Sequence, residues 1–467
     1  MRTLSFSFFL FLLVTTALQG ANRPNIILMM ADDMGWGDTG FNGNEIIQTP
    51  HLDEMAKAGL KLNRFYSAAP VCSPTRGSCM TGRHPYRYGI YSANTGHMKT
   101  EELTLPELLK KKGYTTGHFG KWHMGTLTKT LKDANRGGPK GAGHFSPPQD
   151  NGFEICFSTE SKTPTYDPMI KPIKASGKVW DYLTDKSKSA PYGTYYWDEK
   201  GQMVTDNLEG DDSRVIMDRA IPFIEKATRA KKPFFTVIWF HAPHLPVVAG
   251  PKHVKPYAEY PSYERNYYGC ITALDEQVGR LRASLKQLGI ANNTMVWFGS
   301  DNGPEGKAKS APGTAGPFRG RKRDLYEGGV RVPALVEWPA VVKAGTTTSI
   351  PAVTSDYLPT ILEIVGAEKA ESRPLDGVSL VSLLKGQMKQ RSEPIGFQSK
   401  NLLALSDNRF KLYSGDKGKT WELYDLLRNP AEDKDIAEKH PDVVVRMKKV
   451  LAEWRASCVR SDQGGDY

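Results

Sequence analysis

Four short segments constrain the fold of this 467-residue chain more than any other feature. They cover residues 25–31, 114–119, 233–240 and 294–299, and three of them are almost continuously apolar. Runs of this length are typical of strands that are buried on both faces of a largely parallel sheet. We therefore expect an α/β fold, with a large, mixed and mostly parallel sheet between layers of helices.

The segments between these strands carry helix signals. Thr49-Pro50 caps a helix that Gly59 ends, residues 212–228 form another, and leucines three and four apart predict a long amphipathic helix that ends at Gly289. The stretch 125–209 has little periodicity, and we expect it to be loops that shape a substrate pocket.

The character of the sequence changes near Arg391. Two short strand patterns flank Ser406-Asp407-Asn408, which is a hairpin signal, and Pro441 opens a final amphipathic helix. We expect a large domain over residues 22–388 and a small C-terminal α+β subdomain with an antiparallel sheet over 389–467.

The N-terminal sequence is typical of an export signal. A short basic start precedes an apolar run from Leu4 to Leu18 and then small residues, so residues 1–21 are expected to be a signal peptide rather than a membrane span. The sequence has no second candidate span. The mature protein is expected to be secreted or periplasmic, with no membrane span.

The charge balance narrows the class of partner. The chain has 62 Lys and Arg against 51 Asp and Glu, a net charge of +11. In an exported protein such a balance suits a polyanionic carbohydrate better than a nucleic acid. For most of the lysines, however, a solvated basic surface is the preferred interpretation.

The five cysteines leave two possibilities open. They are widely spaced, with no Cys-x-x-Cys pattern of the kind that binds zinc. If Cys72 has a chemical role, the other four form either two disulfides or free buried thiols. The cysteines are Cys72, Cys79, Cys156, Cys270 and Cys458.

Polar residues follow each of the four predicted strands. Open α/β sheets place their ligands beyond the carboxyl ends of the strands, so these residues are candidates for one site. Acid and amide oxygens suit a hard cation, Ca²⁺ or Mg²⁺, and an Asp-rich turn explains Asp32-Asp33 alone equally well. The residues are Asp32 and Asp33, Lys121 and His123, His241 and His244, and Asp301 and Asn302.

Several motifs give this site an identity by resemblance. Cys72-Ser73-Pro74-Thr75-Arg76 resembles the signature of the type I sulfatases, which belong to the alkaline-phosphatase-like superfamily. Gly120-Lys121-Trp122-His123, the His-x-Pro at His244 and Tyr326-Glu327-Gly328-Gly329-Val330-Arg331 resemble further blocks of that family, in the same order. Thr75 stands where serine is commoner and Met124 where leucine is usual, and neither change removes a functional group.

The resemblance implies a mechanism that depends on formylglycine. A formylglycine-generating or maturase enzyme would oxidise Cys72, and the hydrated aldehyde has two hydroxyls: one attacks sulfur, and the other later expels sulfate. Ca²⁺ would be bound by Asp32, Asp33, Asp301 and Asn302, with the modified Cys72 among its ligands. Arg76 would hold the formylglycine.

The resemblance also implies roles for the remaining groups. Lys121, Lys322 and His244 would bind the sulfate oxygens, with His244 as proton donor to the leaving alcohol. Asp301 would accept the proton of the attacking hydroxyl, and His123 would assist sulfate release.

The expected substrate is a sulfated polysaccharide or its oligosaccharides. Residues 157–165 resemble loops of sulfatases that act on galactans such as carrageenan, and His97, Arg136, His241 and Arg319 are candidate substrate contacts. Two alternatives stay open: a phosphatase or phosphonate monoester hydrolase of the same superfamily, and a non-catalytic binder of sulfated glycans.

Overall fold

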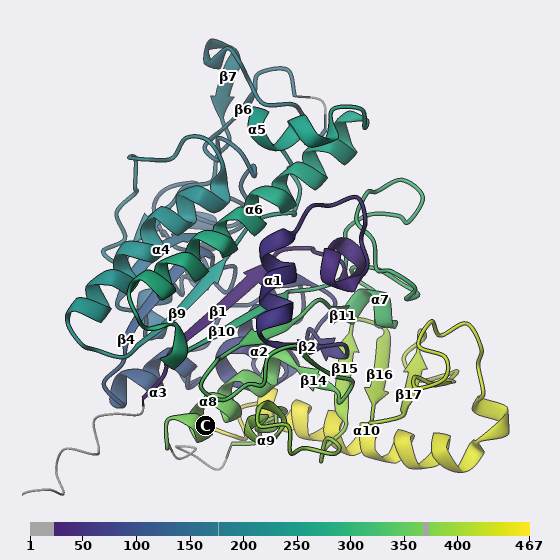
Figure 1. The fold of residues 1–467 in the computed structure, drawn as a ribbon. Helices are drawn as coiled ribbons and strands as arrows, with labels where there is room; N and C mark the ends of the chain where they lie inside the picture. The colour runs from purple at the N-terminus through teal and green to yellow at the C-terminus, as the bar shows by residue number, and fades with distance from the viewer. Residues whose placement is uncertain (1–22, 176, 368–372) are drawn as a thin grey trace, which may run out of the picture.

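The computed structural model describes residues 23–175, 177–367 and 373–467, so the expected signal peptide lies outside the described residues. Its centre is a nine-stranded sheet in the order β13-β2-β12-β10-β1-β9-β4-β5-β8 (Figure 1). The four strands expected from the sequence are neighbours at its centre and mutually parallel. They are β1 (Asn25–Ala31), β4 (Thr115–Lys121), β9 (Phe234–Trp239) and β10 (Thr294–Ser300).

The outer strands make the sheet mixed. On one side β12 (Leu335–Glu337) pairs antiparallel with both β10 and β2 (Leu60–Leu62), and β13 (Thr346–Thr348) is parallel to β2. On the other side β5 (Ile155–Thr159) is parallel to β4, and β8 (Trp197–Asp198) is antiparallel to β5.

Strand β5 corrects the expectation that residues 125–209 form only loops. Its five residues Ile-Cys-Phe-Ser-Thr are too few and too polar to give a periodic signal. The strand forms because its backbone pairs with β4, with Phe157 opposite Phe119. Tertiary pairing therefore decides the structure of this segment, and a fifth parallel strand reaches the same edge of the sheet.

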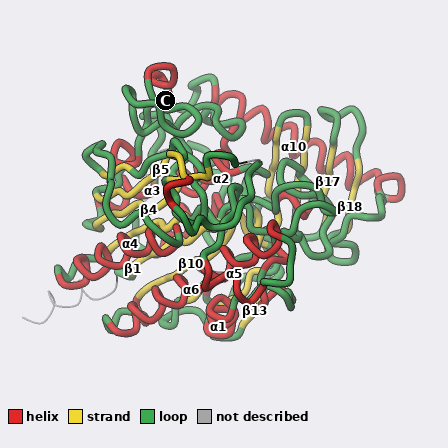
Figure 2. Tube along the Cα trace, turned by 90° about the horizontal axis from the view of Figure 1, so that it is seen from above, coloured by secondary structure: helices red, strands yellow, loops and turns green. Residues whose placement is uncertain are grey.

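Alternate residues of β1 enter two separate cores. Ile27 and Met29 pack under α1 (Pro50–Ala58), α4 (Asp212–Arg229) and α6 (Ser262–Gln287). Leu28 and Met30 belong to the opposite core, with α2 (Cys72–Thr81), α3 (Leu105–Lys111) and α8 (Tyr357–Ile364). Figure 2 shows α2 and α3 on the opposite side of the strands from α6 and α1.

A second, four-stranded sheet lies at the C-terminal end of the chain (Figure 1). It is antiparallel, and α10 (Pro441–Asp462) covers one face through Met447 and Leu451. Its other face packs against Tyr66 and Val353 of the larger part. This arrangement confirms the expected fold class. The strands are β15 (Ile395–Ser399), β16 (Leu402–Ser406), β17 (Phe410–Ser414) and β18 (Glu422–Asp425).

The structure also bears on disulfide bonds and on membrane-spanning helices. All five cysteines are free and buried, so the disulfide alternative is not realised. In the described ranges, no helix combines the length and the apolar character that crossing a bilayer requires.

Candidate active site

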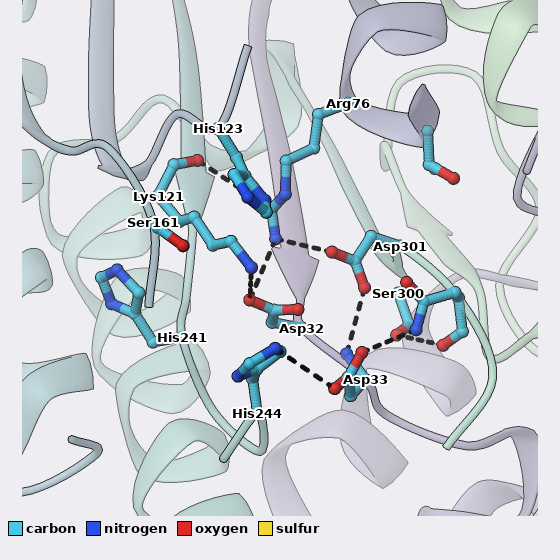
Figure 3. Close-up of polar contacts among 12 residues, drawn as sticks. Asp32, Asp33, Arg76, Lys121, His123, Ser161, His241, His244, Ser300 and Asp301 are labelled. Atoms are coloured by element: carbon cyan, nitrogen blue, oxygen red, sulfur yellow. Dashed lines mark hydrogen bonds and ion pairs between the residues drawn. The ribbon is translucent and has the colours of Figure 1, made fainter. Parts of the chain in front are cut away.

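The polar residues that follow the central strands converge at one edge of the sheet (Figure 3). Asp32 and Asp33 follow β1, Lys121 is the last residue of β4, and Asp301 follows β10. His244 lies on the loop after β9. The convergence has a simple cause, because the carboxyl ends of neighbouring parallel strands lie at the same edge.

Three carboxylates form the floor of this site. Asp32, Asp33 and Asp301 are buried, and Oδ1 of Asp301 accepts the Asp33 backbone N–H at 3.0 Å. Asp33 has a left-handed backbone with φ of 66°, which turns its side chain from the end of β1 into the site and which Asp tolerates better than most residues. The side-chain amide of Asn302 donates to Oδ1 of Asp33 at 2.7 Å.

The donor set fits a hard divalent cation. Oδ1 of Asp32 and Oδ1 of Asn302 are buried, and among the described residues neither accepts a hydrogen bond. Asp32, Asp301 and the sulfur of Cys72 offer atoms that all lie within 4.8 Å of one another, and so do Asp32, Asp33 and His244. Buried oxygens without partners are costly unless a ligand satisfies them, and carboxylate and amide oxygens are the ligands that Ca²⁺ and Mg²⁺ prefer.

Charge in the site is balanced by three cationic side chains. Nζ of Lys121 donates to Oδ2 of Asp32 at 2.5 Å, and Nζ of Lys322 lies 2.6 Å from Oδ1 of Asp33. Burial alone would raise the pKa of Asp32, but Lys121 and the other cations hold it well below its usual value. Burial and then the neighbouring Asp32 raise the pKa of Asp301 to about 7, against the field of Arg76.

Cys72 stands at the N-terminus of α2, a helix whose ten residues are all buried. The free N–H groups of a first helical turn favour negative charge nearby. Burial raises the pKa of the Cys72 thiol, although Lys121 and Lys322 act in the opposite direction. The unmodified thiol is therefore protonated at neutral pH and lacks the activation of a catalytic thiolate.

Arg76 lies one helical turn after Cys72 and links three strands. Its guanidinium donates to Oδ2 of Asp301 at 2.8 Å and to the backbone carbonyl of Lys121 at 3.0 Å. It also lies over the ring of Trp239, 5.1 Å from the centroid. The side chain is fully buried, so its geometry is fixed by these contacts.

The segment Gly120–His123 needs glycine at its first position. Gly120 has φ of 104°, and a Cβ there would lie 1.9 Å from the carbonyl oxygen of Trp239. After this close approach of β4 to β9, the chain turns at His123, whose φ is 61°. The turn places Lys121 and His123 on the same site, as the sequence predicted.

His123 is held by an asparagine that the sequence did not single out. Nε2 of His123 lies 2.9 Å from Oδ1 of Asn94, so the ring donates its Nε2–H to that oxygen. Asn135 donates to the same oxygen at 2.9 Å and to Ser161 at 3.0 Å. Burial, then Lys121, lowers the pKa of His123 well below its usual value, so the ring is neutral.

His244 faces the carboxylates through its Nε2 atom, 3.7 Å from Oδ2 of Asp33. Its Nδ1 lies 2.5 Å from the carbonyl oxygen of Leu245, which can only accept, so Nδ1 carries a proton. Burial lowers the pKa of His244 to about 3, although Asp33 raises it. In the neutral ring, Nε2 is therefore an acceptor.

The loop that carries Lys322 depends on close backbone packing. A Cβ at Gly303 would lie 2.0 Å from the carbonyl oxygen of Gly328, and one at Gly329 would lie 2.0 Å from that of Asp324. Only glycines allow this approach. The Gly-Gly pair of the Tyr326–Arg331 motif thus brings the Lys322 loop against the Asp301–Gly303 segment.

A cavity of about 480 Å³ opens onto the site, and Cys72, His123, His244 and Lys322 line it. The other lining residues include several that sequence reasoning did not single out as contacts, although two of them, Ser161 and Lys162, lie in the predicted pocket loop 157–165. They are Asn94, Asn135, Ser161, Lys162, Lys178 and Lys400.

Four expected substrate contacts do not line this cavity. His97 pairs with the ring of His144, Arg136 is bound to Glu160, and Arg319 lies over the ring of Tyr326. His241 is fully buried between Asp212 and Thr159, with both ring nitrogens 2.7 Å from their partners. These contacts satisfy the side chains within the protein.

Comparison with known proteins places the chain in a family. The sulfatase family model matches residues 24–367, and the model "N-sulphoglucosamine sulphohydrolase, C-terminal" matches residues 316–457. Mouse N-acetylgalactosamine-6-sulfatase is 33% identical over 436 residues, covering 88% of this chain and 77% of its own length. Rat arylsulfatase G is 31% identical over 392 residues, covering 79% and 70%.

A solved structure agrees with these relatives. Ps i-CgsB in complex with k-i-k-neocarrahexaose superposes with a TM-score of 0.78 at 28% identity, over 93% of both chains. The family model covers more than two thirds of the chain, and the relatives and the fold agree with it, which is sufficient to assign the family. The chain therefore belongs to the sulfatase family of the alkaline-phosphatase-like superfamily and is a sulfuric ester hydrolase.

Proposed function

We propose that this sulfatase removes sulfate groups from a sulfated polysaccharide or its oligosaccharides, using a formylglycine made from Cys72 and a bound calcium ion. One observation carries the proposal: buried carboxylates and cations surround Cys72, and two buried oxygens among them lack partners. Buried oxygens without partners are unfavourable, and a bound cation would satisfy them.

The formylglycine and the calcium ion would supply the chemistry that the unmodified side chains lack. Formylglycine provides a hydroxyl nucleophile on a carbon that can later expel sulfate. Asp32, Asp33, Asp301, Asn302 and the modified Cys72 would hold Ca²⁺, which would supply positive charge to stabilise an anionic ester and its nucleophile.

The protein's own residues then bind and orient the ester. Lys121 and Lys322 neutralise Asp32 and Asp33 in the present structure. Positive charge from a bound cation would compete for those carboxylates, and the two lysines are then placed to bind sulfate oxygens. Arg76, fixed by Asp301, holds the residue at position 72 in place, and Asp301 is placed to accept the proton of the attacking hydroxyl.

The histidines have separate tasks. For His244 to give a proton to the leaving alcohol, its ring must be doubly protonated, because Nδ1–H is committed to the carbonyl of Leu245. An anionic sulfate ester at the site favours that imidazolium. His123 remains neutral and, oriented by Asn94, assists the release of sulfate.

The substrate class rests on the cavity and on the relatives. The cavity is lined by Lys162, Lys178, Lys322, Arg323 and Lys400, which suits a polyanion. A relative is named for an N-acetylgalactosamine 6-sulfate, and a similar structure holds k-i-k-neocarrahexaose. We propose that the substrate is a sulfated glycan, with a carrageenan-type galactan as the first candidate. We also propose that the protein is exported and acts on this glycan outside the cytoplasm.

The domain assignment supports the same picture. We propose that residues 22–388 form the catalytic domain and that residues 389–467 form a subdomain that closes one wall of the cavity. The support is that Ser399, Lys400, Asn401 and Leu402 line the cavity together with Cys72.

Mass spectrometry of position 72 is the direct experiment. Trypsin releases residues 65–76 as one peptide, because Arg64 and Arg76 flank it. In active protein produced with a maturase, this peptide should carry formylglycine, and protein produced without a maturase should carry cysteine and be inactive. An unmodified Cys72 in fully active protein would contradict the proposed nucleophile.

Turnover of matched esters tests the reaction class. The purified protein should hydrolyse an aryl sulfate and sulfated oligosaccharides faster than the corresponding phosphate and phosphonate esters. The reverse order would favour the phosphatase or phosphonate hydrolase alternative, and binding of sulfated glycan without turnover of any ester would favour the binder. Metal analysis of the same protein should find calcium in preference to magnesium.

A further inference from the structure

We propose that the wall of the cavity binds a second anionic group of the substrate, through Lys162, Lys178 and Lys400, so that the enzyme prefers saccharides with more than one acidic substituent. This inference rests on the proposed function, because it concerns the substrate of the same site. The three lysines line the cavity together with Cys72 and His244 but lie outside the cluster of carboxylates.

The charge of the cavity wall is unbalanced. Glu305 is the single acidic residue among the described residues that line the cavity. It is already engaged, with Arg323 at 2.6 and 2.9 Å and with Lys322 at 3.3 Å. Within the described ranges, no carboxylate pairs with Lys162, Lys178 or Lys400. Like charges that share a partly dry cavity repel, and an anionic ligand removes that repulsion.

Lys162 is the innermost of the three. It follows β5, the strand whose carboxyl end lies beside that of β4, and Ser161 before it lies on the Lys121 side of the site (Figure 3). Its side chain is half-buried. Burial lowers the pKa of Lys162, with Lys178 and then Lys121 next in effect, so its field reaches both the outer wall and the catalytic centre.

Lys400 is held at the opposite wall by its backbone. It lies in the two-residue turn between β15 and β16, and its N–H donates to the Tyr86 hydroxyl at 2.9 Å. Its φ is 53°, a left-handed conformation that Asn or Gly adopts more easily than Lys.

The ligand chemistry follows from these groups. Ammonium groups bind sulfate and carboxylate alike, as point charges that need no bidentate geometry. The second acidic group is therefore a further sulfate ester or a uronate carboxylate on the same or an adjacent sugar. The sugar between the two anions would lie over the neutral wall of Asn94 and Asn135, whose side chains offer hydrogen bonds to hydroxyls.

The experiment measures binding and turnover with three matched disaccharides. One has a single sulfate ester, one has a second sulfate, and one has a uronate carboxylate in place of the second sulfate. Kd is measured by calorimetry on Cys72→Ala protein, so that binding is read without turnover, and kcat/KM is measured on the active protein. Lys162→Met and Lys400→Asn are each compared with Lys419→Met, an exposed lysine outside the cavity.

We expect the parent protein to bind a doubly acidic disaccharide at least tenfold more tightly than the monosulfated one. Lys162→Met and Lys400→Asn should each reduce that preference by roughly tenfold, and Lys419→Met should leave it unchanged. Lys400→Asn also suits the left-handed turn, so its effect cannot be ascribed to a damaged fold. The preference should weaken as ionic strength rises.

The outcomes separate the two proposals. Equal affinity for singly and doubly acidic saccharides, or a preference that survives both substitutions, overturns the second-anion site even if sulfate esters are hydrolysed. A lysine-dependent preference in binding, without turnover of any sulfate ester, upholds the site and overturns the proposed function. Preference for only one of the two doubly acidic saccharides shows whether the second site binds a sulfate or a carboxylate.

Discussion

The substitution Lys411→Met is expected to destabilise the protein strongly although it lies outside the cavity. Nζ of Lys411 lies 3.0 Å from Oε1 of Glu327 and 3.1 Å from Oε1 of Glu432, and all three side chains are fully buried. Glu327 belongs to the Tyr326–Arg331 motif, so this network connects the C-terminal sheet to the loop that carries Lys322.

The two carboxylates depend on Lys411 to different extents. Glu327 also contacts Arg331 at 3.2 Å and the Tyr66 hydroxyl at 3.0 Å, so it keeps a cation and a donor when the lysine is lost. Among the described residues, the side chain of Glu432 then keeps only the backbone N–H of Glu327, at 2.5 Å. Removal of the lysine therefore leaves Glu432 as the uncompensated charge.

The magnitude follows from these distances. An ion pair at about 3 Å has a Coulomb energy of roughly 5 kcal/mol at an effective dielectric constant of about 20, and relief of the desolvation of the ammonium offsets part of it. Loss of one partner of a buried pair typically reduces the free energy of unfolding by about 3–5 kcal/mol. We expect Lys411→Met to fall in this range and Lys419→Met, at an exposed lysine, to change it by less than about 0.5 kcal/mol.

The loss should depend on pH in a defined direction. Burial raises the pKa of Glu432 to about 7 even though Lys411 lowers it, so removal of the lysine raises this pKa further. Below pH 7 the carboxyl of Glu432 is mostly neutral in both the parent and the variant, so the substitution reduces the free energy of unfolding by less. Above pH 7 the variant must keep the carboxyl protonated or bury its charge, which adds about 1.4 kcal/mol per pH unit up to the new pKa.

Urea unfolding followed by tryptophan fluorescence at pH 6.5 and pH 8.5 provides the test. The parent, Lys411→Met and Lys419→Met proteins should be compared through their midpoints, with the slopes checked for equality. A loss below about 1 kcal/mol at pH 8.5, or the same loss at both pH values, would refute the view that Lys411 compensates buried carboxylates.

Three further predictions concern the catalytic centre and the interface with α10. Cys72→Ala should abolish sulfate ester turnover while the melting temperature stays nearly unchanged; retained turnover would exclude residue 72 as the nucleophile. Chelation should remove activity and lower the melting temperature, and Ca²⁺ at about 100 times its Kd should restore about 2.7 kcal/mol; a chelator-treated protein of unaltered stability would argue against a bound cation. Burial lowers the pKa of His84 to about 4, with Nε2 unpartnered among the described residues and the ring packed on Trp454. The unfolded chain takes up a proton on His84 near pH 6.5 and the folded protein only near pH 4, so the free energy of unfolding is undiminished above about pH 6.5 and declines below it. About 2 kcal/mol should be lost between pH 7 and pH 5. His84→Asn should lack that dependence, which unfolding curves at both pH values can establish.

Much of the fold could be predicted because the signals were local and strong. The segments 25–31 and 294–299 are apolar after their first residue, and they became β1 and β10, which pair in parallel register. Helix α1 begins after Thr49 at Pro50 and ends before Gly59, as the cap and the stop predicted. Strand β5 was missed because five residues with two polar side chains acquire a strand conformation only through pairing with β4.

The candidate site likewise has residues that local sequence could predict and residues whose position depends on tertiary packing. Asp32, Asp33, Lys121, His244 and Asp301 could be predicted to meet because each follows a central strand of a parallel sheet. His241 occupies the same kind of position as His244, yet Asp212 and Thr159 enclose it. The His-x-Pro motif favours His244 over His241 for the cavity, but the residues that enclose His241, Asp212 and Thr159, belong to distant segments and only side-chain packing brings them together.

The family could be predicted from residue order, because its motifs stand in the same order in this chain: a cysteine before Pro and Arg, Gly-Lys-Trp-His, His-x-Pro and Tyr-Glu-Gly-Gly-Val-Arg. The shape and charge of the cavity around these groups depend on the folded chain. Lys162, Lys178 and Lys400 are more than two hundred residues apart at their extremes and share no motif. They line one cavity because β5 joins the central sheet and the C-terminal hairpin folds back onto it, and such contacts arise from packing between distant segments rather than from any local pattern.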